Sequence, residues 1–184
     1  MAERYEIRFS GAGGQGLITA GIILAEAASI IDGKHAVQSQ SYGPEARGGA
    51  SKSEVIISDE PIDYPKATIV DACLAMTQEA TDKYANGIKD GGLLLIDSDF
   101  VKQVPEGNFK VVRIPIMRTA KEDIGREIVA NVVALGAMIA LTDVVSRESG
   151  EKAVLAKVPE AFIDLNKKAY SVGFEKVKEY LAAQ

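Results

Sequence analysis

The sequence predicts an α/β fold, and three observations support this class. A glycine cluster, Gly11 to Gly16, separates a strand-like run from a long apolar helical run. Short strand-like runs then alternate with helical patterns through the first half of the chain. After Pro115 no further strand is evident, and the remaining residues are typical of helices. We therefore expect a three-layer α/β/α sandwich with a Rossmann-like sheet that is mixed but largely parallel, followed by a helical C-terminal part.

The expected elements follow from local patterns along the chain. Apolar and β-branched runs between turn residues predict strands at residues 5–9, 35–40, 52–57, 68–74, 92–96 and 110–114. Periodic apolar runs predict helices at residues 15–31, 78–88, 120–145, 149–157 and 160–181. No helix is expected between the second and third strands. One pair of strands can therefore be antiparallel, which would make the sheet mixed.

The composition is typical of one globular domain spanning residues 1–184, with no proline- or serine-rich stretch to divide it. The 21 basic and 26 acidic side chains leave a net charge of −5, which disfavours nucleic acid as a partner. The N-terminus shows no signal-peptide pattern, and the longest near-apolar run, residues 128–141, is too short to span a bilayer. We therefore expect a cytoplasmic protein that does not bind a membrane.

The run of residues 128–141 is apolar around its whole helical circumference, apart from Asn131. A helix of this kind must be covered on every side. Two interpretations are open. The helix lies in the core of the domain, or part of it contacts another subunit.

Few side chains offer catalytic or metal-binding chemistry. Cys73 is the single cysteine and lies in an apolar run, so we interpret it as a small buried hydrophobe. One cysteine cannot form an internal disulfide, a thiolate metal site or an iron–sulfur cluster. Asp97 and Asp99 end a predicted strand, but two carboxylates are too few for a hard cation, so we expect solvated side chains. We assign no catalytic residue and no metal site to this chain.

The glycine cluster has the chemistry of a phosphate-binding turn. Glycines let the backbone turn sharply beside a ligand, and the first amides of the following helix point at an anion. The candidate ligand-binding residues are Gly11, Gly13, Gly14, Gln15 and Gly16. The alternative is that these glycines only allow tight packing of strand and helix. A plain NAD site is disfavoured, because Asp32 lies in the predicted turn after the helix and not at the end of the second strand.

A second motif, residues 41–49, forms a loop between the second and third predicted strands. Gly-Pro and Gly-Gly pairs disfavour regular structure there, and an aromatic ring, a carboxylate and a guanidinium stand within six positions. Arg47 can bind phosphate or carboxylate with two parallel hydrogen bonds. A local surface pair of Glu45 with Arg47 is the alternative. The candidate residues of this loop are Ser41, Tyr42, Gly43, Pro44, Glu45, Arg47, Gly48 and Gly49.

The two motifs together, Gly-x-Gly-Gly-Gln-Gly and Tyr-Gly-Pro-Glu-x-Arg-Gly-Gly, resemble the gamma subunit of 2-oxoacid:ferredoxin oxidoreductases. The resemblance extends over nearly the full chain, including residues 125–126, 131–136 and 166–174. It implies an oxidative decarboxylation of a 2-oxoacid with coenzyme A, giving an acyl-CoA, carbon dioxide and reduced ferredoxin. It also implies that alpha and beta subunits carry thiamine diphosphate, Mg²⁺ and the iron–sulfur clusters, with a delta or ferredoxin-like subunit as a further candidate partner.

For this chain the resemblance implies a subunit that binds none of those cofactors alone. The glycine cluster would help to bind coenzyme A, the phosphate-bearing co-substrate. The loop of residues 41–49 would lie at a subunit interface bordering the active site. Pyruvate, 2-oxoglutarate, branched-chain oxoacids and indolepyruvate are all open as substrates, and 2-oxoglutarate is favoured. A free-standing nicotinamide dehydrogenase and an anion-binding regulatory module are the alternatives that the glycine cluster alone would suggest.

Overall fold

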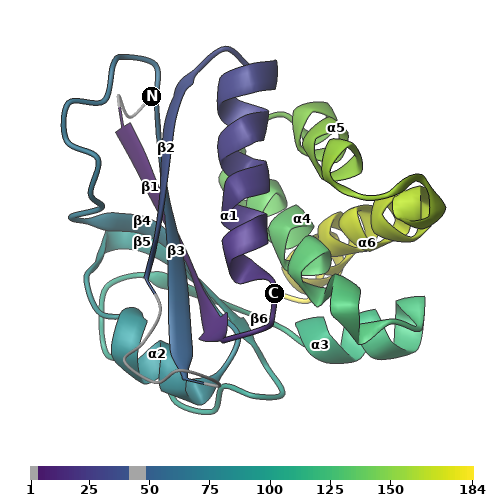
Figure 1. The fold of residues 1–184 in the computed structure, drawn as a ribbon. Helices are drawn as coiled ribbons and strands as arrows, with labels where there is room; N and C mark the ends of the chain where they lie inside the picture. The colour runs from purple at the N-terminus through teal and green to yellow at the C-terminus, as the bar shows by residue number, and fades with distance from the viewer. Residues whose placement is uncertain (1–3, 42–48) are drawn as a thin grey trace.

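A computed structural model describes residues 4–41 and 49–184, and its centre is a six-stranded sheet in the order β2-β3-β1-β4-β5-β6 (Figure 1). β1 pairs with β3 in antiparallel and with β4 in parallel fashion, and β2 is antiparallel to β3. β4, β5 and β6 continue the parallel half. The strands are β1 (Arg4–Ala12), β2 (His35–Ser41), β3 (Ala50–Ser58), β4 (Val70–Ala75), β5 (Ile88–Asp97) and β6 (Lys110–Ile114).

Helices cover the two faces of the sheet unequally. One face carries most of the helices, and the short α2 lies against the other (Figure 1). The arrangement confirms the mixed α/β sheet and the helical C-terminal part. The helices are α1 (Leu17–Glu26), α2 (Gln78–Tyr84), α3 (Ile116–Thr119), α4 (Ala130–Thr142), α5 (Arg147–Lys157) and α6 (Ile163–Ala182).

The core has two parts because side chains of a strand alternate between the faces of a sheet. On the side of α1 and α4, residues such as Phe9, Leu74 and Leu95 form the larger cluster. On the α2 side, Cys73 and Leu94 belong to the smaller cluster. β4 is buried along its whole length. Its continuous apolar run is therefore the pattern of a strand covered on both faces.

Several helix boundaries differ from the sequence-based expectation, and those of the first three expected helices have a clear physical reason. The first helix begins at Leu17 because Gly16 has a left-handed backbone, and its last five residues, Ala27–Ile31, form a π-helical turn. The helix expected at 78–88 ends at Tyr84, since Gly87 is left-handed and Ile88 already belongs to β5. The helix expected at 120–145 is interrupted at Gly125, whose φ of 88° ends a π-helical turn before a 3-10 turn leads into α4.

α4 and α6 cross with their backbones in close contact. A Cβ added at Gly136 would collide with the carbonyl oxygen of Tyr170, and one added at Gly173 would collide with that of Val133. Residues 132–139 of α4 are all buried within this chain. The interpretation of this segment as a core helix is confirmed, whereas Ile128 before the helix is 82% exposed. No helix in residues 4–41 and 49–184 has the length and apolar character needed to span a membrane.

We expect Gly173→Ala to lower the free energy of unfolding by about 1–3 kcal/mol, because the added methyl group separates two close-packed helices. Urea unfolding followed by circular dichroism measures the change. Glu175→Ala, at an exposed position two residues further along α6, is the control and should change stability by less than about 0.5 kcal/mol. Equal stability of the Gly173 variant and the parent would contradict the close crossing.

Candidate functional site

The glycine turn lies at the end of β1, in the middle of the sheet. β1 ends at Ala12 and α1 begins at Leu17, so only four residues reverse the direction of the chain. Gly14 has a φ of 90° and Gly16 a φ of 74°, in the left-handed region that favours glycine. The turn therefore lies at the carboxyl edge of the parallel strands, where open α/β sheets bind their ligands.

Hydrogen bonds within the turn show which candidates shape it. The backbone amide of Gln15 donates to the Ala12 carbonyl at 3.2 Å, and the amide of Ala12 donates to the Gln15 side-chain oxygen at 2.8 Å. The Gln15 oxygen is therefore engaged inside the turn. A Cβ on Gly11 would collide with the Gln15 and Leu17 side chains. Close packing of strand and helix, the alternative interpretation, thus accounts for Gly11.

Among residues 4–41 and 49–184, the first backbone donors of α1 have no acceptor, and they lie beside a pocket. The first intrahelical bond runs from the Ala20 amide to the Gly16 carbonyl at 3.0 Å, so the amides of residues 17–19 have no acceptor within the helix. Glycine at the N-cap supplies no capping side chain. A pocket of about 240 Å³ opens at this point and is lined by Ala12, Gly13, Gly14, Gly16, Leu17, Ile18 and Ser51. A concave surface at an uncapped helix N-terminus favours a bound anion.

The glycine turn is joined directly to the end of the second predicted motif. The Gly13 amide donates to the Gly49 carbonyl at 3.1 Å. Ala50, the next residue, is held on the α2 side. Its amide donates to the Glu79 carboxylate at 3.2 Å, and its carbonyl accepts from the Tyr84 hydroxyl at 3.2 Å. The two motifs, separate in sequence, therefore meet at one edge of the sheet.

The other residues of the second motif are only partly described. Ser41 is the exposed last residue of β2 and pairs with Lys52 of β3. The loop thus begins and ends at the edge of the sheet that carries the glycine turn. The remaining candidates lie outside the described residues, namely Tyr42, Gly43, Pro44, Glu45, Arg47 and Gly48.

A contact that the sequence analysis missed comes from α4. The side-chain amide of Asn131 donates to the Gly16 carbonyl at 3.2 Å. A Cβ on Gly16 would lie 2.7 Å from the Asn131 side-chain nitrogen, so Asn131 fills the space that a larger residue at the N-cap would need. The one available signal was that Asn131 is the single polar side chain in the apolar run of residues 128–141.

The expectation of a solvated carboxylate is wrong for Asp97. The side chain is buried, and its two oxygens accept the amides of Asp99 at 2.9 Å and Met117 at 2.8 Å. Burial raises the pKa of the Asp97 carboxyl above its ordinary value. The start of α3 covers this end of β5, which a strand pattern alone does not reveal. Asp99 is half-buried and pairs with Arg118 at 3.1 Å.

Asp32 makes hydrogen bonds that hold two parts of the fold together. Asp32 follows the π-helical turn and accepts hydrogen bonds from the Ser146 amide and the Ser149 hydroxyl. It therefore stabilises the start of α5 and lies away from the end of β2, where a carboxylate that binds the ribose of NAD would be needed.

Cys73 is fully buried, which confirms its interpretation as a core residue, and burial raises the pKa of its thiol to about 11. Within residues 4–41 and 49–184, no three His, Cys, Asp or Glu side chains are grouped to hold a metal ion.

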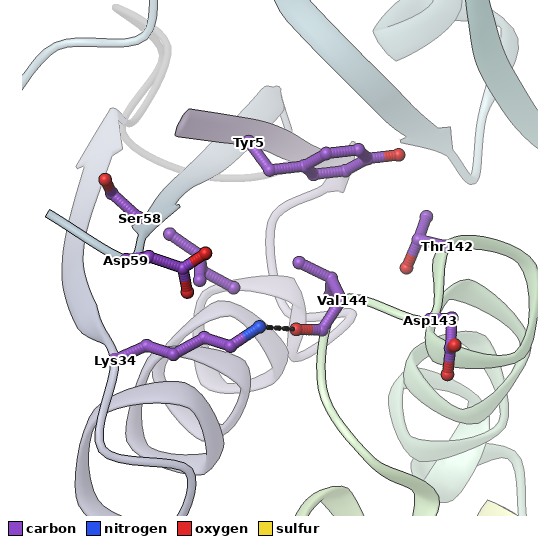
Figure 2. A pocket seen from close by; sticks show the side chains of 8 residues that line it. Tyr5, Lys34, Ser58, Asp59, Thr142, Asp143 and Val144 are labelled. Carbon is purple, nitrogen blue, oxygen red and sulfur yellow. Dashed lines mark hydrogen bonds between the residues drawn. The ribbon is translucent and has the colours of Figure 1, made fainter. Parts of the chain in front are cut away.

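A second pocket, of about 230 Å³, lies near the start of β1 and the end of α4 (Figure 2). The Lys34 ammonium group donates to the Val144 carbonyl there at 3.0 Å and so links the start of β2 to the end of α4. None of the predicted site residues that the structure describes lines this pocket. It is lined by Tyr5, Lys34, Ile57, Ser58, Asp59, Thr142, Asp143 and Val144.

The fold and the turn define an α/β protein with a glycine-rich strand-to-helix connection at the carboxyl edge of a mixed sheet. Residues 6–176 match the family model described as pyruvate ferredoxin/flavodoxin oxidoreductase. The 2-oxoglutarate synthase subunit KorC of Methanocaldococcus jannaschii is 54% identical over 178 residues, covering 96% of this chain and 95% of that subunit.

Two solved structures extend the comparison. The keto/oxoacid ferredoxin oxidoreductase gamma subunit of Geobacter sulfurreducens is 66% identical with a TM-score of 0.91, over 97% of this chain and 99% of that one. The 2-oxoglutarate:ferredoxin oxidoreductase of Magnetococcus marinus, solved with 2-oxoglutarate, coenzyme A and succinyl-CoA, is 25% identical with a TM-score of 0.83, over 97% of this chain and 32% of that one. The chain belongs to the pyruvate ferredoxin/flavodoxin oxidoreductase family, as a gamma-type subunit of a 2-oxoacid:ferredoxin oxidoreductase.

Proposed function

We propose that this subunit serves the CoA-dependent oxidative decarboxylation of 2-oxoglutarate and that its glycine turn binds a phosphate group of coenzyme A. The substrate is inferred from the KorC relative, which is named a 2-oxoglutarate synthase subunit and matches over nearly its full length. The observation that carries the phosphate proposal is the pocket at the uncapped start of α1. Coenzyme A brings phosphates to this reaction, and backbone amides at a helix N-terminus are suited to them.

The residues of the turn have different proposed roles. Gly13 and Gly14 are exposed and line the pocket, so they would lie next to the phosphate. Gly11, Gln15 and Gly16 shape the turn through packing, an internal hydrogen bond and the left-handed N-cap. The binding energy would come mainly from backbone amides, because none of the described residues that line the pocket has a charged side chain.

The second motif, residues 41–49, is proposed to border the active site at an interface with another subunit. The hydrogen bond from Gly13 to Gly49 supports this, because it places the end of the loop beside the proposed phosphate site. Tyr42 and Arg47 are the side chains proposed to contact a partner or the substrate, since aromatic rings and guanidinium groups dominate binding energy at interfaces.

The cofactors are proposed to belong to the partner subunits. Thiamine diphosphate with Mg²⁺ and the iron–sulfur clusters would be carried by alpha and beta subunits, with a delta or ferredoxin-like subunit as a further partner. The 184 residues contain one cysteine, too few for the ligands of a cluster. A free-standing dehydrogenase is disfavoured because Asp32 is engaged with Ser146 and Ser149. We further propose that residues 1–184 act as one domain in a cytoplasmic enzyme.

The first test uses the isolated chain. We expect it to fold and to show no turnover with 2-oxoglutarate, coenzyme A and an electron acceptor, because the cofactors carry the bond-breaking chemistry. The assay follows reduction of the acceptor, with the complete enzyme as positive control. Turnover by the pure chain would contradict the proposed division of labour.

The second test compares two glycines with the same backbone conformation. Gly14 and Gly33 both have left-handed φ angles, and a Cβ at either would meet no atom of residues 4–41 and 49–184 within 4 Å. The alanine variants should therefore share the same backbone strain, about 1–2 kcal/mol. We expect only Gly14→Ala to raise the KM for coenzyme A, by about tenfold, because its methyl group stands beside the pocket. An unchanged KM in an assembled Gly14 variant would restrict the glycines to a packing role.

The third test concerns Arg47. Arg47→Lys keeps the charge but loses the planar pair of donors, so a residue that binds an anion or anchors an interface should not tolerate it. We expect loss of turnover if Arg47 contacts a ligand and loss of assembly if it anchors a partner, each by about tenfold or more. Copurification and steady-state kinetics separate the two. Normal assembly with normal turnover would leave only a surface pair with Glu45.

A further inference from the structure

We propose that Asn131 is a positioning residue for coenzyme A binding. It acts through the carbonyl of Gly16 and fixes the direction in which the first turn of α1 presents its amides. The inference rests on the proposed function of the glycine turn. It adds a role for the helical second half of the chain, which the two sequence motifs do not include.

The contact is made at the point where the turn becomes a helix. The Gly16 carbonyl accepts the Ala20 amide at 3.0 Å and the Asn131 side-chain amide at 3.2 Å. Two donors on one carbonyl fix the plane of the peptide group that joins Gly16 to Leu17. That plane carries the Leu17 amide, the first donor of the helix. A change at Asn131 would therefore be transmitted to the proposed site without any contact between Asn131 and the phosphate.

The residue type fits this role better than it fits its helix. Asparagine is a weaker helix former than leucine or alanine, and the neighbouring positions of α4 are apolar and buried. An apolar side chain would suit the helix but could not donate to Gly16. The Gly16 contact is the hydrogen bond that the Asn131 side chain makes within the described part of the chain. Asn131 and the glycine at position 16 also fit sterically, because a Cβ on Gly16 would lie 2.7 Å from the Asn131 nitrogen.

The substitution of Asn131 by aspartate is the most sensitive probe. Asn131→Asp keeps the shape but turns a carboxylate oxygen toward the Gly16 carbonyl, and it adds negative charge near the proposed phosphate. Asn131→Ala removes the donor without adding charge. Asn166→Asp is the matched control, because Asn166 is buried and, like Asn131, lines a pocket of about 230 Å³ between α4 and α6. Its side chain donates to the Phe162 carbonyl at 2.9 Å and to no residue of the described glycine turn.

The experiment measures kcat and the KM for coenzyme A in the complete enzyme assembled with each variant. We expect Asn131→Asp to raise that KM by about tenfold and Asn131→Ala by about threefold, with kcat within about twofold of the parent. Asn166→Asp should lower the melting temperature and leave the KM unchanged. A role of Asn131 in stability alone would change the melting temperature and leave the KM as it is, so the KM separates positioning from folding.

Each outcome decides between the proposals. An unchanged KM in both Asn131 variants overturns the positioning role, as does an equal rise in Asn166→Asp. If Asn131→Asp does not assemble, the alanine variant decides alone. Gly14→Ala separates the proposed phosphate site from the proposed positioning role of Asn131. If it raises the KM while the Asn131 variants do not, the phosphate site stands and the positioning role is wrong. If it does not raise the KM either, both are wrong.

Discussion

The reversal of the chain between β1 and α1 is the constraint on which the rest of this structure depends. β1 is paired on both sides, antiparallel with β3 and parallel with β4. The chain after β1 therefore has to turn out of the plane of the sheet and into α1. Four residues make that turn, and two of them have left-handed backbones. The result is a helix whose first amides face a pocket and not a capping side chain. The geometry of the turn thereby determines the position of the proposed phosphate site.

The turn is held from both sides by parts of the chain distant in sequence. On one side the Gly13–Gly49 hydrogen bond joins it to the start of β3, which α2 braces through Glu79 and Tyr84. On the other side Asn131 reaches it from α4. The position of α4 depends in turn on its glycine-mediated crossing with α6. The helical second half therefore supports the site and does more than complete the core.

The sequence predicted those features that depend on local pattern. Strand positions followed from short apolar runs, and the mixed sheet followed from the missing helix before residue 50. The features that the sequence did not predict depend on tertiary contacts. Asp97 is buried because α3 folds over the end of its strand, and Asn131 meets Gly16 across 115 positions of sequence. The end of the helix at Tyr84 and the interruption at Gly125 depend on left-handed glycines, whose conformation a helical periodicity does not reveal.

The proposed phosphate site, if it is composed of backbone amides, has a consequence for divergence in this family. Side-chain ligands require particular residues, but amides require only that the main chain keep its course. The M. marinus chain retains the fold with a TM-score of 0.83 at 25% identity. Such divergence is compatible with a proposed function that depends on the shape of one turn and on the few residues that hold it. Glycines at 14 and 16, together with the donor at 131, are then the positions where a single side-chain change would alter the site most.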